Sequence, residues 1–136
     1  MKMTVPFWTG LMMNIKKGEI YLANLGDVKH ADIGKIRPVL IFQNNNLNRM
    51  IEDGLYNDVI IIPFSSQIKQ SDFTYTLKKR DKLEKDSTIL CNAIKMISTK
   101  RLLLSKGLLT SLKSNELREI ESRIALVLDM NYGKQI

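Results

Sequence analysis

The spacing of apolar residues changes near Ser114, and this change limits the possible fold more than any other feature of the chain. Before Ser114, apolar residues form short β-favouring runs that polar residues or glycine separate. From Leu117 to Leu128 they recur every three or four residues, which is typical of an amphipathic helix. Several short strands followed by one helix predict a mainly β protein, with a small bent sheet or barrel and a C-terminal helix packed against it.

Length and composition indicate one globular domain. The chain has 136 residues, of which 44% are hydrophobic and 26% are charged. A single cysteine, Cys91, and a single histidine exclude an internal disulfide and the usual zinc cluster. No acidic cluster argues for a carboxylate-bound metal, so we expect neither a metal nor a cofactor. The formal net charge of +7 favours a polyanionic partner, of which nucleic acid is the commonest.

The first residues are expected to lie outside the folded domain. We predict an N-terminal extension over residues 1–15 and a single domain over residues 16–136. The apolar part of the extension is too short to span a bilayer, and no small-residue cleavage site follows it. We therefore expect no membrane association, and the lone Cys91 fits the reducing cytoplasm.

The predicted strands are short runs rich in β-branched and aromatic residues. They cover residues 19–25, 36–42, 58–63, 73–77, 87–92, 93–97 and 101–104, the fifth and sixth being two strands or one bent strand. Residues 44–57 predict a loop with one or two helical turns, and a loop is expected from Phe64. Ser114 is the predicted N-cap of the helix, in which Glu119 and Arg123 are one turn apart.

One octet, residues 34–41, sets an arginine at the mouth of a buried strand. Gly34 allows a sharp turn before it, and the residue before a proline is extended, so Pro38 fixes the backbone of Arg37. A guanidinium held in this way suits a phosphate, because its planar fork makes paired, charge-assisted hydrogen bonds. From the octet alone, an ordinary surface arginine at a strand start is the simpler interpretation.

Three segments in a fixed order carry a resemblance to a known family. They are residues 18–21 (Gly-Glu-Ile-Tyr), residues 34–41 with Arg37-Pro38, and residues 62–66 (Ile-Pro-Phe-Ser-Ser). Together with the later residues 83–90 and 97–102, they resemble the MazF/PemK family, the toxins of type II toxin–antitoxin modules. The resemblance covers roughly residues 16–128.

The resemblance implies a fold, an activity and partners. The fold would be a small SH3-like barrel of the CcdB/MazF type with a C-terminal helix, usually as a homodimer. The activity would be that of an mRNA interferase, an endoribonuclease that cuts single-stranded RNA, generally mRNA, at short sequences without a metal. The partner would be an acidic antitoxin whose extended tail blocks the RNA groove.

The resemblance also implies four candidate catalytic residues. Arg37 matches the arginine at the scissile phosphate and would stabilise the transition state. Ser65 would place a hydroxyl on a phosphate oxygen or the 2′-OH, although serines in loops commonly bond nearby backbone. Asp32 matches a glutamate of several relatives and would act as a base or orient the arginine, unless it is a solvated loop acid. His30 lies near a histidine of the Kid/PemK branch only after a one-residue shift, and its near-neutral pKa makes it testable.

Residues after the hydroxyl loop are candidates for RNA binding. Amides can contact base edges, aromatic rings can stack on bases, and lysines can follow the backbone. Tyr75 is equally consistent with a core position, and the lysines with a solvated turn. The candidates are Ser66, Gln67, Lys69, Tyr75 and Lys79.

The sequence departs from one branch of the family. The Kid/PemK toxins rely on an arginine and an aspartate in a later strand, where this chain has Leu90-Cys91-Asn92. The departure leaves open a non-catalytic relative that only binds RNA or an antitoxin. A CcdB-like gyrase poison is a weaker alternative, because the chain lacks that toxin's tryptophan-containing tail.

Overall fold

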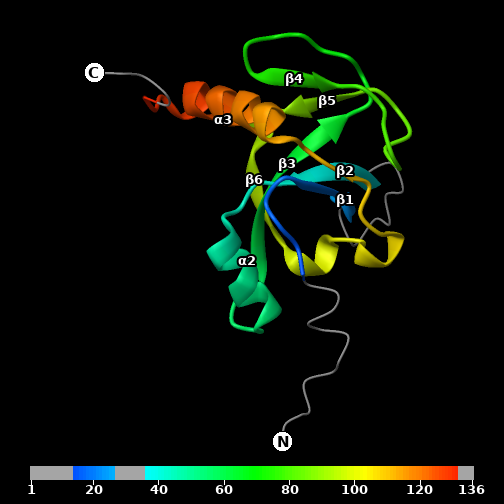
Figure 1. Cartoon of the computed structure of the whole chain (residues 1–136), viewed down its shortest axis with the longest axis vertical. Coiled ribbons are helices and arrows are strands. Elements are labelled where there is room, and N and C mark those ends of the chain that lie inside the picture. The colour runs from blue at the N-terminus through cyan, green and yellow to red at the C-terminus, as the bar shows by residue number, and fades with distance from the viewer. Residues whose placement is uncertain (1–13, 27–35, 132–136) are drawn as a thin grey trace, which may run out of the picture.

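The computed structural model describes residues 14–26 and 36–131. Within these residues, seven strands form one curled antiparallel sheet in the order β4-β5-β3-β2-β1-β7, with β6 paired to β3, and a helix crosses one end of it (Figure 1). The elements are β1 (Glu19–Asn24), β2 (Ile36–Ile41), α2 (Asn45–Glu52), β3 (Asp58–Ser65), β4 (Thr74–Leu77), β5 (Ser87–Leu90), β6 (Lys95–Ser98), β7 (Thr110–Ser111) and α3 (Ser114–Leu128), with 3₁₀ helices η3 (Cys91–Ala93), η4 (Thr99–Arg101) and η5 (Leu104–Lys106). This arrangement confirms the predicted mainly β fold.

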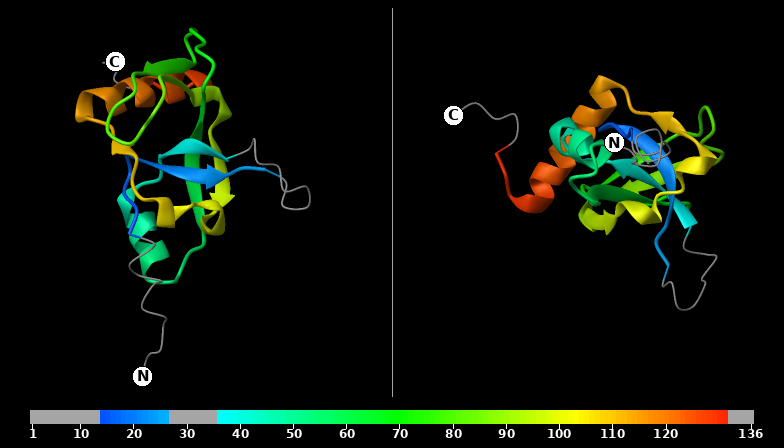
Figure 2. Two further views of the ribbon diagram at one scale, coloured as in Figure 1. Left: turned by 90° about the vertical axis from the view of Figure 1, so that its right-hand side faces the viewer. Right: turned by 90° about the horizontal axis from the view of Figure 1, so that it is seen from below.

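The long strand β3 makes the sheet curl, because it changes partners along its length. Its first part pairs with β2 and β6, and its last two residues pair with β5. The predicted end of this strand at Pro63 is wrong, since the strand continues to Ser65. Pro63 lies opposite Val39 and has no N–H to donate, and beyond it the strand leaves β2 and places Ser65 opposite Thr88. Figure 2 shows the curvature from two further sides.

The sheet separates two hydrophobic clusters, so β1 and β2 are buried on both faces. Alternate residues of a strand point to opposite faces, which sends neighbouring side chains into different clusters. One cluster includes residues of α3 and the other includes Ile51 of α2. The first contains Ile20, Leu40, Ile62, Phe64, Ile89 and Ile120, and the second contains Tyr21, Val39, Ile41, Val59, Ile61 and Leu102.

Helix α3 has the predicted extent, but its N-cap is different. The cap is Lys113, whose backbone N–H donates to the Glu116 carboxylate at 2.8 Å, so Ser114 is the first helical residue. The predicted pair of Glu119 and Arg123 is confirmed at 2.8 Å. Arg123 also donates to the Thr74 carbonyl of β4 at 2.8 Å, which fastens the helix to the sheet.

Two other predictions can be compared with the structure. The helical turns expected in residues 44–57 form α2, capped by the Asn44 side chain, which accepts the Leu47 N–H at 2.9 Å. The strand predicted over residues 101–104 is wrong, because η4 and η5 flank a single bridge from Leu102 to Ala23. The two-residue strand β7 was too short to predict.

The described chain begins with packed residues. Ile15, the last residue of the expected extension, is only 3% exposed and belongs to the second cluster. None of the described helices combines the length and the apolar composition needed to cross a bilayer. Gly34, His30 and Asp32 lie outside the described residues.

Candidate active site

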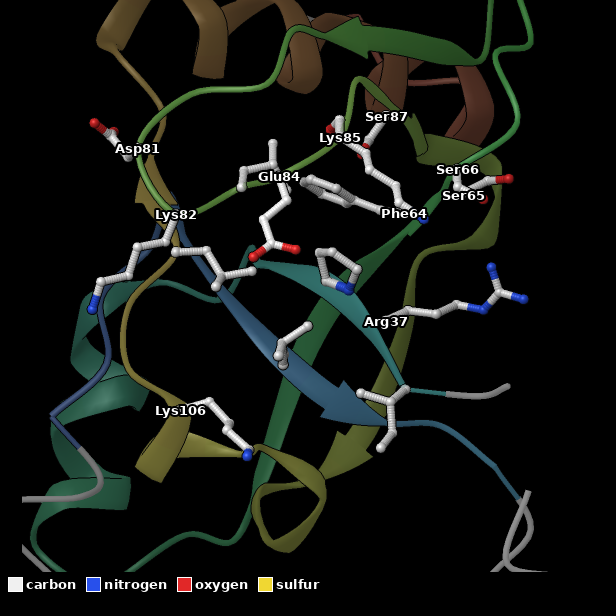
Figure 3. Close-up of a pocket in the computed structure, with 15 residues that line it drawn as sticks. Arg37, Phe64, Ser65, Ser66, Asp81, Lys82, Glu84, Lys85, Ser87 and Lys106 are labelled. Atoms are coloured by element: carbon white, nitrogen blue, oxygen red, sulfur yellow. The ribbon is translucent and has the colours of Figure 1, made fainter. Parts of the chain in front are cut away.

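A pocket of about 650 Å³ opens where β2 begins and β3 ends, and the loop between β4 and β5 forms its other wall (Figure 3). Its volume is in the range of pockets that hold small organic ligands. Its charged and hydroxyl side chains are Arg37, Ser65, Ser66, Asp81, Lys82, Glu84, Lys85, Ser87 and Lys106. Its apolar lining comes from Leu22, Ile36, Pro38, Phe64, Leu83 and Leu109.

The strand register brings Arg37 and Ser65 to the same part of this pocket. In the β2–β3 ladder Val39 lies opposite Pro63, so Arg37 and Ser65 each lie two residues beyond this pair, at the same end of the two strands. Arg37 is also paired with Ala23 of β1, which holds its backbone from the other side. Figure 3 shows the Arg37 side chain on the same side of the pocket as Ser65 and Ser66.

The guanidinium of Arg37 has no structural partner in the described chain. The side chain is half-buried and makes no hydrogen bond or ion pair with any residue of 14–26 or 36–131. A guanidinium has five N–H donors, and these remain available for a ligand. An unpaired arginine at a strand start, beside two hydroxyls, is an arrangement that fits a phosphate group.

The hydroxyl of Ser65 makes one local hydrogen bond and can still make another to a ligand. Its Oγ accepts the backbone N–H of Gln67 at 3.1 Å, which is the turn contact that serines commonly make. A hydroxyl has one donor and two lone pairs, so its proton can still be donated to a ligand. The loop beyond it is fixed by the buried Thr88, whose hydroxyl donates to the Gln67 carbonyl at 2.8 Å and accepts the Lys69 N–H at 3.0 Å.

The second wall of the pocket is rich in charge. Lys82 is held by its backbone N–H, which donates to the Leu109 carbonyl at 3.0 Å, and its ammonium lies beside Gly107. Lys106 ends η5 immediately before Gly107, so Lys82 and Lys106 approach the same end of the pocket (Figure 3). Glu84 lies between this end and the Arg37 side.

An ion pair fastens this wall to α3. Arg80 makes two hydrogen bonds to the Glu116 carboxylate, at 2.7 and 2.8 Å, and further bonds to the Thr110 hydroxyl and the Ser111 carbonyl. The hydrogen bond from Arg80 lowers the pKa of the Glu116 carboxyl below its usual range, and the bond from the Lys113 N–H acts in the same direction. The loop that carries Lys82 and Lys85 is therefore anchored by residues that do not line the pocket.

The other candidate RNA-binding residues do not line the pocket. Gln67 and Lys69 are exposed beyond Ser66, and Lys79 is an exposed residue whose N–H donates to Asp86 at 2.8 Å. The Tyr75 ring packs against the first hydrophobic cluster and lies 5.2 Å from the Arg123 guanidinium, and burial raises its pKa.

Among the pocket residues that sequence reasoning missed are Glu84, Lys85 and Lys106. The charged turn that contains Glu84 and Lys85 was visible in the sequence, but its position across from Arg37 was not. His30 and Asp32 lie outside the described residues. In residues 14–26 and 36–131, no three His, Cys, Asp or Glu side chains are grouped to hold a metal ion.

Comparison with known proteins identifies the family. A family model described as "PemK-like, MazF-like toxin of type II toxin-antitoxin system" matches residues 16–128. The chain belongs to this family. It is also 33% identical over 125 residues to the Endoribonuclease MazF of Staphylococcus epidermidis, an alignment that covers 86% of this chain and 93% of that protein.

Solved MazF structures share the fold. A crystal structure of MazE–MazF from Deinococcus radiodurans has a TM-score of 0.67 at 17% identity, covering 87% of this chain and 99% of that chain. A MazF toxin of Mycobacterium tuberculosis has a TM-score of 0.66 at 17% identity, covering 84% and 99%. These similarities confirm the predicted MazF-type barrel with a C-terminal helix.

The departure from the Kid/PemK branch is a structural feature of this family member. Cys91 is fully buried in η3, where burial raises the pKa of its thiol to about 11. Asn92 is exposed, and neither it nor Leu90 lines the pocket. The pocket of this chain is lined mainly by β2, the end of β3 and the β4–β5 loop, with Lys106 added by η5.

Proposed function

We propose that this chain is the toxin of a type II toxin–antitoxin system and a sequence-specific endoribonuclease that cuts single-stranded RNA, generally mRNA, without a metal. One observation carries the proposal. The unpaired guanidinium of Arg37 shares a pocket with the hydroxyls of Ser65 and Ser66, in the described chain of a MazF-family member. The name of the Staphylococcus epidermidis relative, Endoribonuclease MazF, supports the same activity.

The proposed reaction is an internal transesterification of RNA. The 2′-OH attacks the adjacent phosphorus, the bond to the 5′-oxygen of the next nucleotide breaks, and a 2′,3′-cyclic phosphate and a 5′-OH result. A base must take the 2′-OH proton, an acid must protonate the leaving oxygen, and a cation must stabilise the negative charge that develops on the phosphate oxygens.

Each candidate residue takes one of these roles. Arg37 would bind the non-bridging phosphate oxygens with paired N–H donors and stabilise the transition state. Ser65 would donate its proton to a phosphate oxygen, and Ser66 would contact the neighbouring part of the strand. Asp32 and His30 are the proposed bases. Gln67, Lys69, Tyr75 and Lys79 would then serve only parts of the strand that extend beyond the pocket.

The proposed partners follow from charge and from the family. An acidic antitoxin would compete with RNA for a chain whose formal net charge is +7. One similar solved structure is described as an endoribonuclease in complex with its cognate antitoxin. We also propose that the chain acts in the cytoplasm as a homodimer.

The deciding experiment incubates the purified protein with a long single-stranded RNA in excess EDTA and maps the cut ends. We expect cuts at a short recurring sequence and 2′,3′-cyclic phosphate ends. Arg37→Ala should abolish them, whereas Arg118→Ala, which removes an exposed arginine of α3, should not. Cuts that persist unchanged in Arg37→Ala would refute the assigned site.

The same experiment separates the alternatives. RNA that binds in a salt-sensitive manner and is recovered intact would identify a non-catalytic relative. The gyrase-poison alternative has no support from the family match, which describes PemK-like and MazF-like toxins.

A further inference from the structure

A carboxylate lies in the middle of a pocket otherwise suited to a polyanion. Glu84 lines the pocket together with the cationic side chains of Arg37, Lys82, Lys85 and Lys106. In Figure 3 its carboxylate points into the pocket, between the Arg37 side and the Lys106 side. A carboxylate repels phosphates, so its presence calls for a partner that offers hydrogen-bond donors.

Glu84 has no structural task within the described chain. It makes no hydrogen bond or ion pair with any residue of 14–26 or 36–131. Asp81, the other carboxylate of the pocket, is different, because it accepts the Thr110 hydroxyl at 2.6 Å. Two acidic residues of one loop thus differ in role, and only Glu84 has both oxygens available to a ligand.

The surroundings of Glu84 fit a base rather than a phosphate. Apolar groups of Pro38, Leu83 and Leu109 line the same pocket and can accept the face of a planar ring. Cations lie at both ends, with Arg37 on one side and Lys82 and Lys106 on the other. A strand can therefore place one phosphate at each end and the intervening base against Glu84.

We propose that Glu84 is a specificity-determining residue that accepts hydrogen bonds from a guanine next to the scissile phosphate. The proposal rests on the proposed function, since it names the base that the same pocket selects. Guanine is the base that presents two adjacent N–H donors, N1–H and the N2 amino group, on its Watson–Crick edge. A carboxylate has two acceptor oxygens at a matching spacing, so the pair is bidentate.

The first experiment compares cleavage profiles. The wild type, Glu84→Gln and Glu84→Ala are incubated with an unstructured RNA pool that contains a randomised segment, and the cut ends are sequenced. The wild type should prefer guanine at one position beside the cut by about fivefold to a hundredfold. Glu84→Gln should shift that position toward adenine, because an amide offers one donor and one acceptor, and Glu84→Ala should lose the preference.

A matched control removes an acidic side chain elsewhere. Glu52→Gln changes an exposed glutamate at the end of α2, outside the pocket, and should leave the cleavage profile unchanged. Lys106→Ala should weaken cleavage of all sequences alike, because a phosphate contact carries no base information.

The second experiment measures binding without cleavage. Short 2′-deoxy oligonucleotides with one guanine in a thymine background are compared with the same oligonucleotides carrying inosine, which lacks the N2 amino group. The wild type should lose about fivefold or more in affinity on this change, and Glu84→Gln should lose little. This arm still decides the proposal if the wild type proves inactive, which would refute only the proposed function.

Three results would overturn the proposal. One is an unchanged base preference at every position in Glu84→Gln and Glu84→Ala. Another is an equal loss from inosine in wild type and Glu84→Gln. The third is an equal loss of cleavage for all sequences in Glu84→Gln, with a shifted pH profile and an unchanged base preference. That result would identify Glu84 as a general base instead.

Discussion

Arg37 lines the pocket, whereas Arg80 precedes the pocket residues of the β4–β5 loop and does not line it, and the two guanidinium groups have opposite uses. Arg80 makes two hydrogen bonds to the Glu116 carboxylate and further bonds to Thr110 and Ser111. Arg37 makes no hydrogen bond or ion pair with any residue that the structure describes. The Arg80 guanidinium is hydrogen-bonded within the protein, whereas the N–H donors of Arg37 have no partner among the described residues.

The difference teaches where stability and function reside in this domain. A guanidinium that is hydrogen-bonded within the protein contributes to the stability of the fold, because its removal leaves a partly buried carboxylate without its partner. An open guanidinium contributes little to folding, but it is ready for an anion without any prior rearrangement. We therefore expect substitutions at the two arginines to affect different measurements.

The largest expected effect is on activity, at Arg37. Arg37→Ala should lower the RNA cleavage rate by about 10²- to 10³-fold, the range typical for loss of a transition-state donor. Its free energy of unfolding in urea should change by less than about 0.5 kcal/mol, because no hydrogen bond or ion pair with the described residues is lost. A clear loss of stability in this variant would show that Arg37 has a structural partner. It would contradict the proposed difference between Arg37 and Arg80.

Arg80 should show the opposite pattern. Arg80→Ala should lower the free energy of unfolding by about 2 kcal/mol, since the Glu116 carboxylate is only 13% exposed and loses a two-bond partner. Well below the melting temperature, cleavage should fall by less than about tenfold, an expectation that rests on the remaining contact between Lys82 and Leu109. Urea unfolding and cleavage rates measured side by side, with Arg118→Ala as the control, would decide.

Ser65 should give a smaller effect on activity. Ser65→Ala should lower cleavage by about tenfold, because one neutral hydrogen bond to the phosphate is lost while Arg37 remains. Ser65→Thr should keep most of the activity, since it retains the hydroxyl. Equal losses in both variants would contradict a role of the hydroxyl in cleavage, because threonine retains it.

The smallest expected effect is the pH dependence of the stability that the pair of Arg80 and Glu116 contributes. The pKa of Glu116 is lowered in the folded protein by its hydrogen bonds, first from Arg80. A lowered carboxyl pKa stabilises the fold above the unfolded value of about 4.3 and loses this contribution as pH falls through the folded value. The difference in melting temperature between wild type and Glu116→Gln should therefore shrink between about pH 6 and pH 3. A constant difference would assign the stabilisation to a cause other than the charge.

The sequence allowed much of the β framework and the Arg37–Ser65 side of the pocket to be predicted. Arg37 and Ser65 come from two adjacent strands, so strand patterns and the family motif were enough to place them. Lys106 is brought to the pocket by η5, a short 3₁₀ turn that no sequence pattern predicted. The sequence could not place Glu84 in the pocket, because the path of its loop depends on the hydrogen bonds from Arg80 to Glu116. These bonds join residues that are far apart in the chain.

Two errors concern the ends of elements, and each has its own physical reason. The third predicted strand ended too early because a proline ordinarily closes a ladder, and here the strand changes neighbours at Pro63. The predicted N-cap was one residue late because Ser114 has the usual side chain for a cap, whereas Glu116 caps the helix through the Lys113 N–H. In the first case a change of strand partner outweighed a local preference, and in the second one local capping contact replaced another.

The double-sided burial of β1 and β2 has a consequence for how such toxins can diverge. Adding or deleting one residue inside β2 would send every following side chain to the wrong face and exchange the two hydrophobic clusters. Viable changes of length are thereby confined to the connecting segments. Arg37 would keep its position in the barrel while natural variation changes the loops that line the pocket. New target sequences can therefore arise without a change in the position of the catalytic arginine.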